Sequence, residues 1–446
     1  MAPASKIAST LSDANFSSNR TNMTSDLHRT PRGTADILPD DQPYWDWIRD
    51  TAREVTRRFD YRRIDTPVFE GTSVFVRTVG EGTDIVEKEM YTFLDRGDDQ
   101  LTLRPEGTAP VCRAYLQHGM HSLPQPVRMF YIAPIFRYER PQAGRYRQHW
   151  QFGVEAIGDP NPEVDAETIH LLWSFLAELG LQDLSLRLNS IGDTVCRPAY
   201  LDALRAHYQP RLGEVCDDCR VRYEKNPLRL LDCKQGRCQS AIADAPQISG
   251  LLCDACAEHF AGVRSILELW EIPYEIAPRL VRGLDYYTRT VFEIHPAVER
   301  SQTALGAGGR YDGLIERLGG RATPGVGFGS GIERMILNLK EAGIEPPGVA
   351  RPDVFIVYLG EQAQRKALGL AAELRANGLS VLAPTGSRSL RAQFRAADTS
   401  GAPTAIVLGD DELKRGEATV RDLKTGDQSS IPMDRIVDAL SVSSQS

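Results

Sequence analysis

The chain is 446 residues long and carries 52 Lys and Arg against 60 Asp and Glu, which gives a formal net charge of −8. A chain of this length is expected to form about two to four domains, each able to bury a core. The acidic balance excludes a surface that coats nucleic acid throughout, but local basic patches still bind phosphate because salt screens charges beyond about 10 Å. No apolar run approaches the roughly 20 residues of a membrane-spanning helix, so we expect no membrane partner.

The first residues, 1–28, are rich in Ser, Thr, Asn and Ala and have little apolar periodicity, which predicts a disordered leader. This stretch lacks the continuous apolar core of a secretory signal, and Met23 is an alternative start. We therefore expect a cytoplasmic protein whose eight cysteines are thiols or metal ligands rather than disulfides.

The next segments alternate between helical and extended patterns. Apolar residues at helical spacing predict an amphipathic helix that ends near Phe59. The stretch "YRRIDTPVFE" is typical of a strand that Pro67 confines to an edge or an interface. In "LTLRPEGTAPVCRAYLQ" we expect a strand, a turn and a helix capped by Thr108.

A long hairpin is predicted by "VRMFYIAPIFRY" and "HWQFGVEAIG", which an arginine-rich loop joins. A helix follows from Glu163 to Leu179, and "LSLRLNSIG" predicts another strand. Residues 196–270 are mostly helical in pattern and hold seven of the eight cysteines, which indicates an insertion. Strand and glycine signals then return.

After the Pro- and Gly-rich linker "EAGIEPPGVARPD", strands and helices alternate as in a small α/β domain with a substantially parallel sheet. The whole pattern predicts an α+β chain with four parts after the leader. These are the first part of a core at 29–195, a helical Cys-rich insertion at 196–272, the second part of the core at 273–345, and a C-terminal α/β domain at 351–441.

The second strand of the hairpin carries polar groups on one face. By alternation Gln151, Gly153 and Glu155 share a face, and the apolar residues between them point the other way. An amide, a bare backbone and a carboxylate suit the floor of a pocket for a small polar cation. The alternative is the solvent face of an edge strand.

In "TPGVGFGSGIERM" four glycines fall at every second position, from Gly325 to Gly331, and remove the side chains from one strand face. A flat base would fit there, with Arg334 on the following helix near its phosphates. Close packing of a helix on the sheet is the alternative. The spacing differs from a dinucleotide fingerprint, and no P-loop motif occurs in the sequence.

Three arginines, Arg137, Arg282 and Arg334, lie in separate segments near strands or glycine turns. Guanidinium groups bind phosphate oxygens in a bidentate way and keep their charge, so the three together would hold a triphosphate. Taken singly, each is better explained as a surface arginine.

Taken together, these segments resemble the class II aminoacyl-tRNA synthetases, and within them the histidyl-tRNA synthetases, from about Arg29 to the end of the chain. The most diagnostic stretches are "LVRGLDYY" and "AGGRYDG". The resemblance implies an antiparallel sheet flanked by helices, a C-terminal anticodon-binding domain, and a homodimer whose interface includes the Pro67 segment. It implies that ATP activates L-histidine to histidyl-adenylate and that the histidyl group then passes to tRNA(His).

Residue roles are carried over by position. The residues implied for histidine are Glu106, Gly107 and Thr108 of "PEGT" with Gln151, near the amino group, and Glu155, Tyr286 and Tyr287, near the imidazole. Adjacent tyrosines on a strand face opposite ways, so we expect only one of the two to touch the ring.

For ATP, the resemblance implies that Arg137 grips the α-phosphate, that Arg334 grips the γ-phosphate, and that Arg282 neutralises charge at the α-phosphate during attack. It also implies Mg²⁺ bridging the phosphates. Gly327 and Gly329 would lie beside the nucleotide.

Further arginines are candidates for tRNA contacts. Arg145 and Arg147 on the hairpin loop would meet ATP or the acceptor end. Arg388, Arg391 and Arg395 stand at i, i+3, i+7 and predict a basic stripe on a helix of the C-terminal domain, with a solvated face as the alternative.

Two C-x-x-C pairs, Cys216 with Cys219 and Cys253 with Cys256, predict a tetrahedral structural Zn²⁺ site, with free thiols as the alternative. For the function, two alternatives to a histidine–tRNA ligase stay open. One is a synthetase-like regulatory subunit that senses histidine for ATP phosphoribosyltransferase, and the other is a class II synthetase for a different amino acid.

Overall fold

The computed structural model describes residues 28–80, 83–142, 144–296, 304–348, 351–386 and 388–443. The predicted leader lies outside these residues except for His28. The chain divides within the predicted linker into one unit that ends at Ile344 and another that begins at Glu345. Within the described residues, no helix is both long and apolar enough to cross a membrane.

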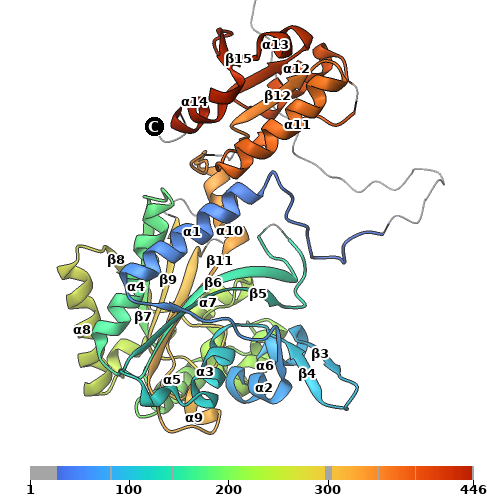
Figure 1. Ribbon diagram of the computed structural model, residues 1–446. Helices are drawn as coiled ribbons and strands as arrows, with labels where there is room; N and C mark the ends of the chain where they lie inside the picture. Colours follow the sequence, from blue (N-terminus) through green and yellow to red (C-terminus); the bar gives the residue numbers. More distant parts are fainter. Residues whose placement is uncertain are drawn as a thin grey trace, which may run out of the picture. The chain divides into compact units, whose positions relative to one another are not determined.

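An eight-stranded sheet forms the centre of the first unit (Figure 1). Its order is β1 (Arg62–Arg63), β5 (Val127–Phe136), β6 (Gln148–Ile157), β11 (Gly325–Gly331), β10 (Gly306–Arg310), β9 (Thr288–Pro296), β7 (Leu184–Ser190) and β8 (Tyr274–Ile276). The six central strands are antiparallel, and only the edge strands β1 and β8 pair in parallel. The antiparallel α+β core and the predicted hairpin are therefore confirmed, with Val127 opposite Ile157 and Phe136 opposite Gln148.

Three helices cover one face of this sheet: α1 (Gln42–Arg58), α4 (Pro162–Glu178) and α10 (Ile332–Glu341). They bury apolar side chains against alternate residues of the strands, among them Phe152, Val154 and Phe328. This alternation determines which side chains are available on the other side of the sheet, because the residues between these positions must point to the opposite face.

The opposite face packs against α3 (Thr108–Gln117), α9 (Leu314–Arg317) and the first three helices of the insertion, which are α5 (Arg197–Tyr208), α6 (Asp217–Lys225) and α7 (Gln239–Ala243). The last helix of the insertion, α8 (Asp254–Leu269), packs on α4 instead and belongs to the core of the first face. A smaller antiparallel sheet joins β2 (Phe69–Gly71), β4 (Gln100–Leu103) and β3 (Tyr91–Leu94), next to α2 (Thr72–Val79). The "YRRIDTPVFE" stretch thus forms two short strands, β1 and β2, with Pro67 between them rather than one continuous strand.

The second unit has a five-stranded sheet in the order β13 (Val381–Leu382), β12 (Val354–Tyr358), β14 (Thr404–Leu408), β15 (Glu417–Asp422) and β16 (Gln428–Pro432). Its helices are α11 (Glu361–Ala376), α12 (Leu390–Ser400), α13 (Asp410–Arg415) and α14 (Ile436–Ser443). The first three strands are parallel, but β15 and β16 add antiparallel pairs. The sheet is therefore mixed, since a short β15–β16 connection needs no crossover helix.

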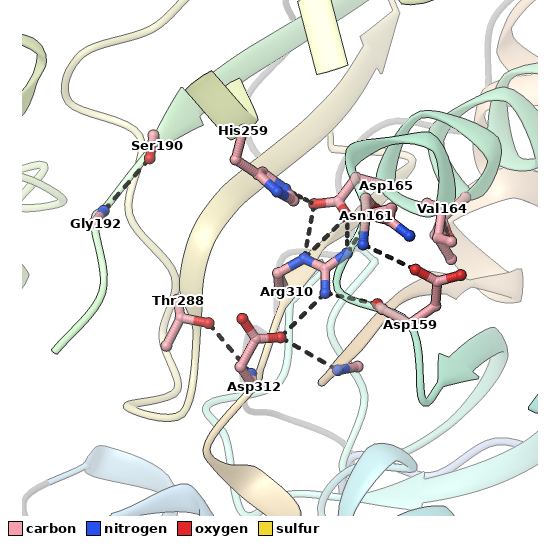
Figure 2. A network of polar contacts seen from close by, with 12 residues as sticks. Asp159, Asn161, Val164, Asp165, Ser190, Gly192, His259, Thr288, Arg310 and Asp312 are labelled. Atoms are coloured by element: carbon pink, nitrogen blue, oxygen red, sulfur yellow. Dashed lines mark hydrogen bonds and ion pairs between the residues drawn. The ribbon is translucent and has the colours of Figure 1, made fainter. Parts of the chain in front are cut away.

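A buried ion-pair network fixes the end of β10 to α4 (Figure 2). The Arg310 side chain is fully buried, and its guanidinium donates to both carboxylate oxygens of Asp165, with Nε to Oδ2 at 3.0 Å. It also pairs with Asp312 at 3.1 Å, and His259 of α8 contacts Asp165 at 3.2 Å. Burial alone would raise the pKa of Asp165, but the charge of Arg310 and the hydrogen bonds hold this pKa below its usual value.

We expect Asp165→Asn to lower the free energy of unfolding of the first unit by about 3 to 5 kcal/mol, because the buried guanidinium loses its counter-charge. Urea unfolding followed by tryptophan fluorescence measures this, since all five tryptophans belong to that unit. The control is Asp50→Asn, which removes an exposed pair with Arg53 and should change stability by no more than about 0.5 kcal/mol. Equal effects of the two substitutions would contradict a structural role for the network.

Candidate active site

A cleft of about 240 Å³ opens where the β5–β6 hairpin, the start of α3, the turn before β9 and the start of α10 meet. All three predicted phosphate-binding arginines, Arg137, Arg282 and Arg334, line it. Five of the residues predicted for histidine also line it, and these are Glu106, Thr108, Gln151, Tyr286 and Tyr287. The structure thus brings segments separated by about two hundred residues of sequence into one site.

The floor of the cleft comes from β6. Gln151 lines the cleft, and Glu155, two strand periods further along the same face, is fully buried beneath it. Phe152 and Val154 point into the apolar core on the other side, as the alternation predicts. The alternative of a solvent-exposed edge strand is excluded, because β6 pairs with β5 on one side and with β11 on the other.

The Glu155 carboxylate accepts two hydrogen bonds, from Thr108 Oγ1 at 2.7 Å and from Tyr311 Oη at 2.6 Å. Burial raises the pKa of Glu155 to about 8, although these two hydroxyl donors oppose the shift. In its ionised form the carboxylate keeps about two acceptor positions for another donor, since an ionised carboxylate offers about four. The group is therefore poised to accept a proton or a hydrogen bond from a ligand.

The expectation that Thr108 caps α3 is wrong. Gly107 stands at the N-cap position, and the Glu106 carboxylate accepts from the backbone N–H groups of Thr108 and Ala109, each at 2.7 Å. The Thr108 hydroxyl is thereby free to bond Glu155. Gly107 itself is required by space, because a Cβ there would lie 2.2 Å from the Tyr131 ring.

The glycines of β11 make room for protein side chains more than for a flat ligand. A Cβ on Gly327 would lie 2.1 Å from the Glu155 carboxylate, and one on Gly329 would lie 2.1 Å from the Gln151 amide. Tyr311 fills the space beside Gly325 in the same way. The expectation of an empty strand face is therefore wrong at these positions, although Gly329 and Gly331 still border the cleft.

Tyr286 and Tyr287 lie in the turn before β9 rather than on a strand. Their ring centroids are 4.7 Å apart, and both rings are buried at the wall of the cleft. The premise that the two residues lie on a strand and face opposite ways is therefore wrong, and the expectation that only one of them touches the imidazole stays a prediction. The Tyr286 hydroxyl also lies 3.4 Å from Glu106 Oε2.

The three cleft arginines are only partly satisfied by the protein. Arg137 Nε donates to the carbonyl of Pro105 at 2.7 Å, and Arg334 donates to the carbonyls of Ala304 and Gly144. Arg282 pairs with Glu293, while its buried Nε has no hydrogen-bond partner among the described residues. Burial, and next the neighbouring Arg145, lower the pKa of Arg334, so these two guanidinium groups repel each other and an anion between them would relieve the repulsion.

Several cleft residues were missed by sequence reasoning. Tyr131, His149, Glu293 and Glu333 line the cleft, and Tyr311 lies just behind it. Burial lowers the pKa of His149 to about 3 and raises that of Glu333 to about 7. Alternation along β5 was a usable signal for Tyr131, but His149 and Glu333 carry no local pattern that distinguishes them.

The arginines predicted to contact tRNA differ in their contacts and in their position in the fold. Arg145 lines the cleft and pairs with Glu139 at 3.3 Å, whereas the Arg147 guanidinium lies over the Tyr138 ring at 3.7 Å. Arg391 and Arg395 are exposed on α12, but Arg388 precedes the helix, which begins at Leu390. The predicted three-residue helical stripe is therefore reduced to two members.

The cysteines form two separate groups, so the predicted set of Cys216, Cys219, Cys253 and Cys256 is wrong. Each C-x-x-C pair finds other partners in space: one group is Cys216, Cys219, Cys233 and Cys238, and the other is Asp193, Cys196, Cys253 and Cys256. In both groups the candidate ligand atoms lie within 4.8 Å of one another. A C-x₄-C and a D-x-x-C spacing in the sequence were the signals for these partners.

Comparisons with known proteins agree with this geometry. A family model described as histidyl-tRNA synthetase matches residues 33–335, and one described as anticodon binding domain matches residues 353–442. Curated histidine–tRNA ligases are 53% identical in Dehalococcoides mccartyi, over 92% of this chain and 98% of the relative, and 49% identical in Moorella thermoacetica, over 92% and 97%. The apo histidyl-tRNA synthetase structure from S. aureus is 40% identical, has a TM-score of 0.80, and is covered in full by 93% of this chain.

The raised pKa of Glu155 predicts a pH-dependent stability. The folded protein keeps a proton that the unfolded chain loses, so this group lowers stability progressively as pH rises from about 4.5 to about 8. Glu155→Gln removes the titration. We therefore expect the free energy of unfolding of this variant, taken relative to wild type, to be higher at pH 8 than at pH 5 by more than about 1 kcal/mol. Urea unfolding at both pH values measures this.

The control for this experiment is Glu258→Gln, which changes an exposed carboxylate on α8 in the same chemical way. Its stability difference from wild type should be the same at both pH values. A pH-independent difference for Glu155→Gln as well would show that Glu155 titrates normally.

Proposed function

The chain belongs to the histidyl-tRNA synthetase family, and on this premise we propose how its cleft is divided between histidine and ATP. The chain is an ATP-dependent aminoacyl-tRNA ligase that activates histidine and transfers it to tRNA. The observation that carries the division is that three arginines line the cleft, while the buried Glu155 lies beneath its floor and bonds Thr108 of its lining.

The two alternative functions have less support. The curated relatives that match nearly full length are histidine–tRNA ligases. A solved structure from Bacillus halodurans C, described as an ATP phosphoribosyltransferase regulatory subunit/histidyl-tRNA synthetase, is 23% identical and shows the fold alone. The histidine-sensing subunit and a ligase for another amino acid are therefore disfavoured.

We place histidine over the β6 floor. Its imidazole would donate to Glu155, whose carboxylate keeps acceptor positions open beside Thr108 and Tyr311, and would contact the Tyr286 and Tyr287 rings. Its ammonium group would meet Glu106 and Gln151, with Gly107 and Thr108 supplying the start of α3. A site that hydrogen-bonds the imidazole in this way rejects apolar isosteres strongly, because they would leave its buried polar groups unpaired.

We place the triphosphate among the arginines. Arg137 would contact the α-phosphate and Arg334 the γ-phosphate, while Arg282 would neutralise the charge that grows on the α-phosphate as the histidine carboxylate attacks. The unpartnered Nε of Arg282 supports this, because a phosphate oxygen would satisfy it. ATP enters as its Mg²⁺ complex. The base would lie toward Gly329 and Gly331, since the Glu155 side chain already occupies the space beside Gly327.

For tRNA, we propose that Arg145 meets the acceptor end at the cleft, and that Arg391 and Arg395 on α12 contact the anticodon region. A tRNA contact is less well supported for Arg147 and Arg388, because Arg147 packs on Tyr138 and Arg388 lies outside the helix. A cytoplasmic location belongs to the same proposal.

We further propose a structural Zn²⁺ at Cys216, Cys219, Cys233 and Cys238. The sulfur atoms of Cys216 and Cys233 are 3.8 Å apart, which is close to the roughly 3.8 Å edge of a tetrahedron with Zn–S bonds of about 2.3 Å. The Cys216 backbone N–H also donates to the Cys238 sulfur at 3.2 Å, which favours a thiolate there.

ATP–pyrophosphate exchange with each amino acid in turn tests the function. We expect exchange with histidine alone, and we expect Arg282→Ala to slow it by about 10² or more while histidine binding is largely retained, as loss of a transition-state charge partner does. Exchange with another amino acid, or none with any, would reject the assignment, and an unchanged rate in the variant would reject the role of Arg282.

The matched control joins Arg391→Ala with Arg395→Ala. These residues lie in the other unit, so this variant should keep the wild-type exchange rate and lose only the charging of tRNA. A variant that charges tRNA normally would show that α12 does not contribute to tRNA binding.

We also propose a homodimer through the small sheet. Val68, Phe69, Phe93 and Leu94 are 41% to 64% exposed there, beside the exposed Pro67. Apolar side chains gathered in this way mark an interface. Phe93→Asp should weaken the dimer at least tenfold in sedimentation velocity, whereas Leu368→Asp on α11, 51% exposed, should leave it intact. A monomeric wild type would reject the proposal.

A further inference from the structure

A second cluster of metal-binding side chains lies where the insertion joins the catalytic sheet. Asp193 and Cys196 follow β7 at the start of α5, and Cys253 and Cys256 begin α8 at the other end of the insertion. Cys196 and Cys256 are buried, and Asp193 and Cys253 are partly exposed. The four side chains thus bring the first and last helices of the insertion together.

The distances in this cluster suit a tetrahedral ion. The Asp193 carboxylate oxygen Oδ1 lies 3.6 Å from the Cys196 sulfur and 3.9 Å from the Cys253 sulfur. In a tetrahedral zinc site with bonds of about 2.3 Å to sulfur and 2.0 Å to oxygen, the sulfur–oxygen edge is roughly 3.5 Å. Gly192 is needed for this approach, because a Cβ there would lie 2.7 Å from the Cys196 sulfur.

We propose that Asp193, Cys196, Cys253 and Cys256 bind a second structural zinc ion, independent of the four-cysteine site. Three thiolates and one carboxylate are ligands that Zn²⁺ accepts in tetrahedral sites, and four protein ligands leave no open position for catalysis. The Asp193 oxygen Oδ2 is held from outside by Arg289 at 3.3 Å, as the second partner of a ligating carboxylate commonly is. The metal site itself does not depend on the ligase activity, whereas its effect on the histidine side of the cleft rests on the proposed function.

The proposed ion would stabilise the wall of the substrate cleft. The Arg197 guanidinium, one residue after Cys196, donates to the carbonyls of Ile191 and Gly192 and, at 2.6 Å, to that of Tyr287. Tyr287 lines the cleft. Because the ion fixes the turn from Asp193 to Cys196, it would also fix Arg197 and, through it, the tyrosine turn. Arg197 is thus a positioning residue.

Metal content of the full-length chain, purified under reducing conditions without chelator, tests the proposal. We expect about two zinc ions per chain by elemental mass spectrometry. Cys253→Ser and Cys216→Ser should each reduce this to about one, and each keeps its helix start because serine is a favoured N-cap residue. The control is Cys112→Ser, which changes a buried cysteine outside both groups and should keep two ions.

A second measurement separates a positioning effect from general damage. Cys253→Ser should raise the KM for histidine severalfold, with a smaller effect on the KM for ATP, because Tyr287 lies on the histidine side in the proposed division of the cleft. The proposal would be overturned if the wild-type protein held one zinc ion per chain, and if this ion were lost in Cys216→Ser but kept in Cys253→Ser. A disulfide among the three cysteines, detected by alkylation and intact mass, would overturn it as well.

Discussion

The alternation of side chains on the two faces of β6 is the constraint on which the cleft of the first unit depends. A strand alternates its side chains, so burying Phe152 and Val154 against the helices obliges Gln151 and Glu155 to face the cleft. A slip of one residue in the pairing of β6 with β5 or β11 would exchange the two sets. The glycines of β11 belong to the same constraint, because any side chain at Gly327 would collide with the Glu155 carboxylate.

The buried arginines of this fold are of two kinds, which differ in how many carboxylate and carbonyl partners surround the guanidinium group. Arg310 is surrounded by Asp165, Asp312 and two backbone carbonyls, so its charge is fully compensated and its role is structural (Figure 2). The cleft arginines have fewer carboxylates among them, and Arg282 keeps a buried donor without a partner among the described residues. Buried polar groups are normally satisfied, so this deficit indicates an anionic ligand.

The insertion supports the tyrosines of the cleft by packing against them. It packs into the same apolar cluster as Tyr286, Tyr287 and Tyr311, and Arg197 at its start holds the Tyr287 carbonyl. Short helices such as α6 and α7 bury little surface on their own, so metal ions at their junctions would replace a larger core. With the proposed ions bound, the insertion would hold the tyrosine turn in place through Arg197.

The sequence by itself determined the features that depend on neighbours along the chain. Alternation predicted the β5–β6 hairpin and its two faces, helical periodicity predicted α1 and α4, and the motif stretches indicated the family. Only the tertiary structure decided the partners. Tyr311 bonds Glu155, the Glu106 carboxylate accepts from the first N–H groups of α3, and Asp193 groups with Cys253 rather than Cys216. The physical reason is that local periodicity fixes which way a side chain points, whereas a contact across 156 residues exists only once the sheet has brought its strands together.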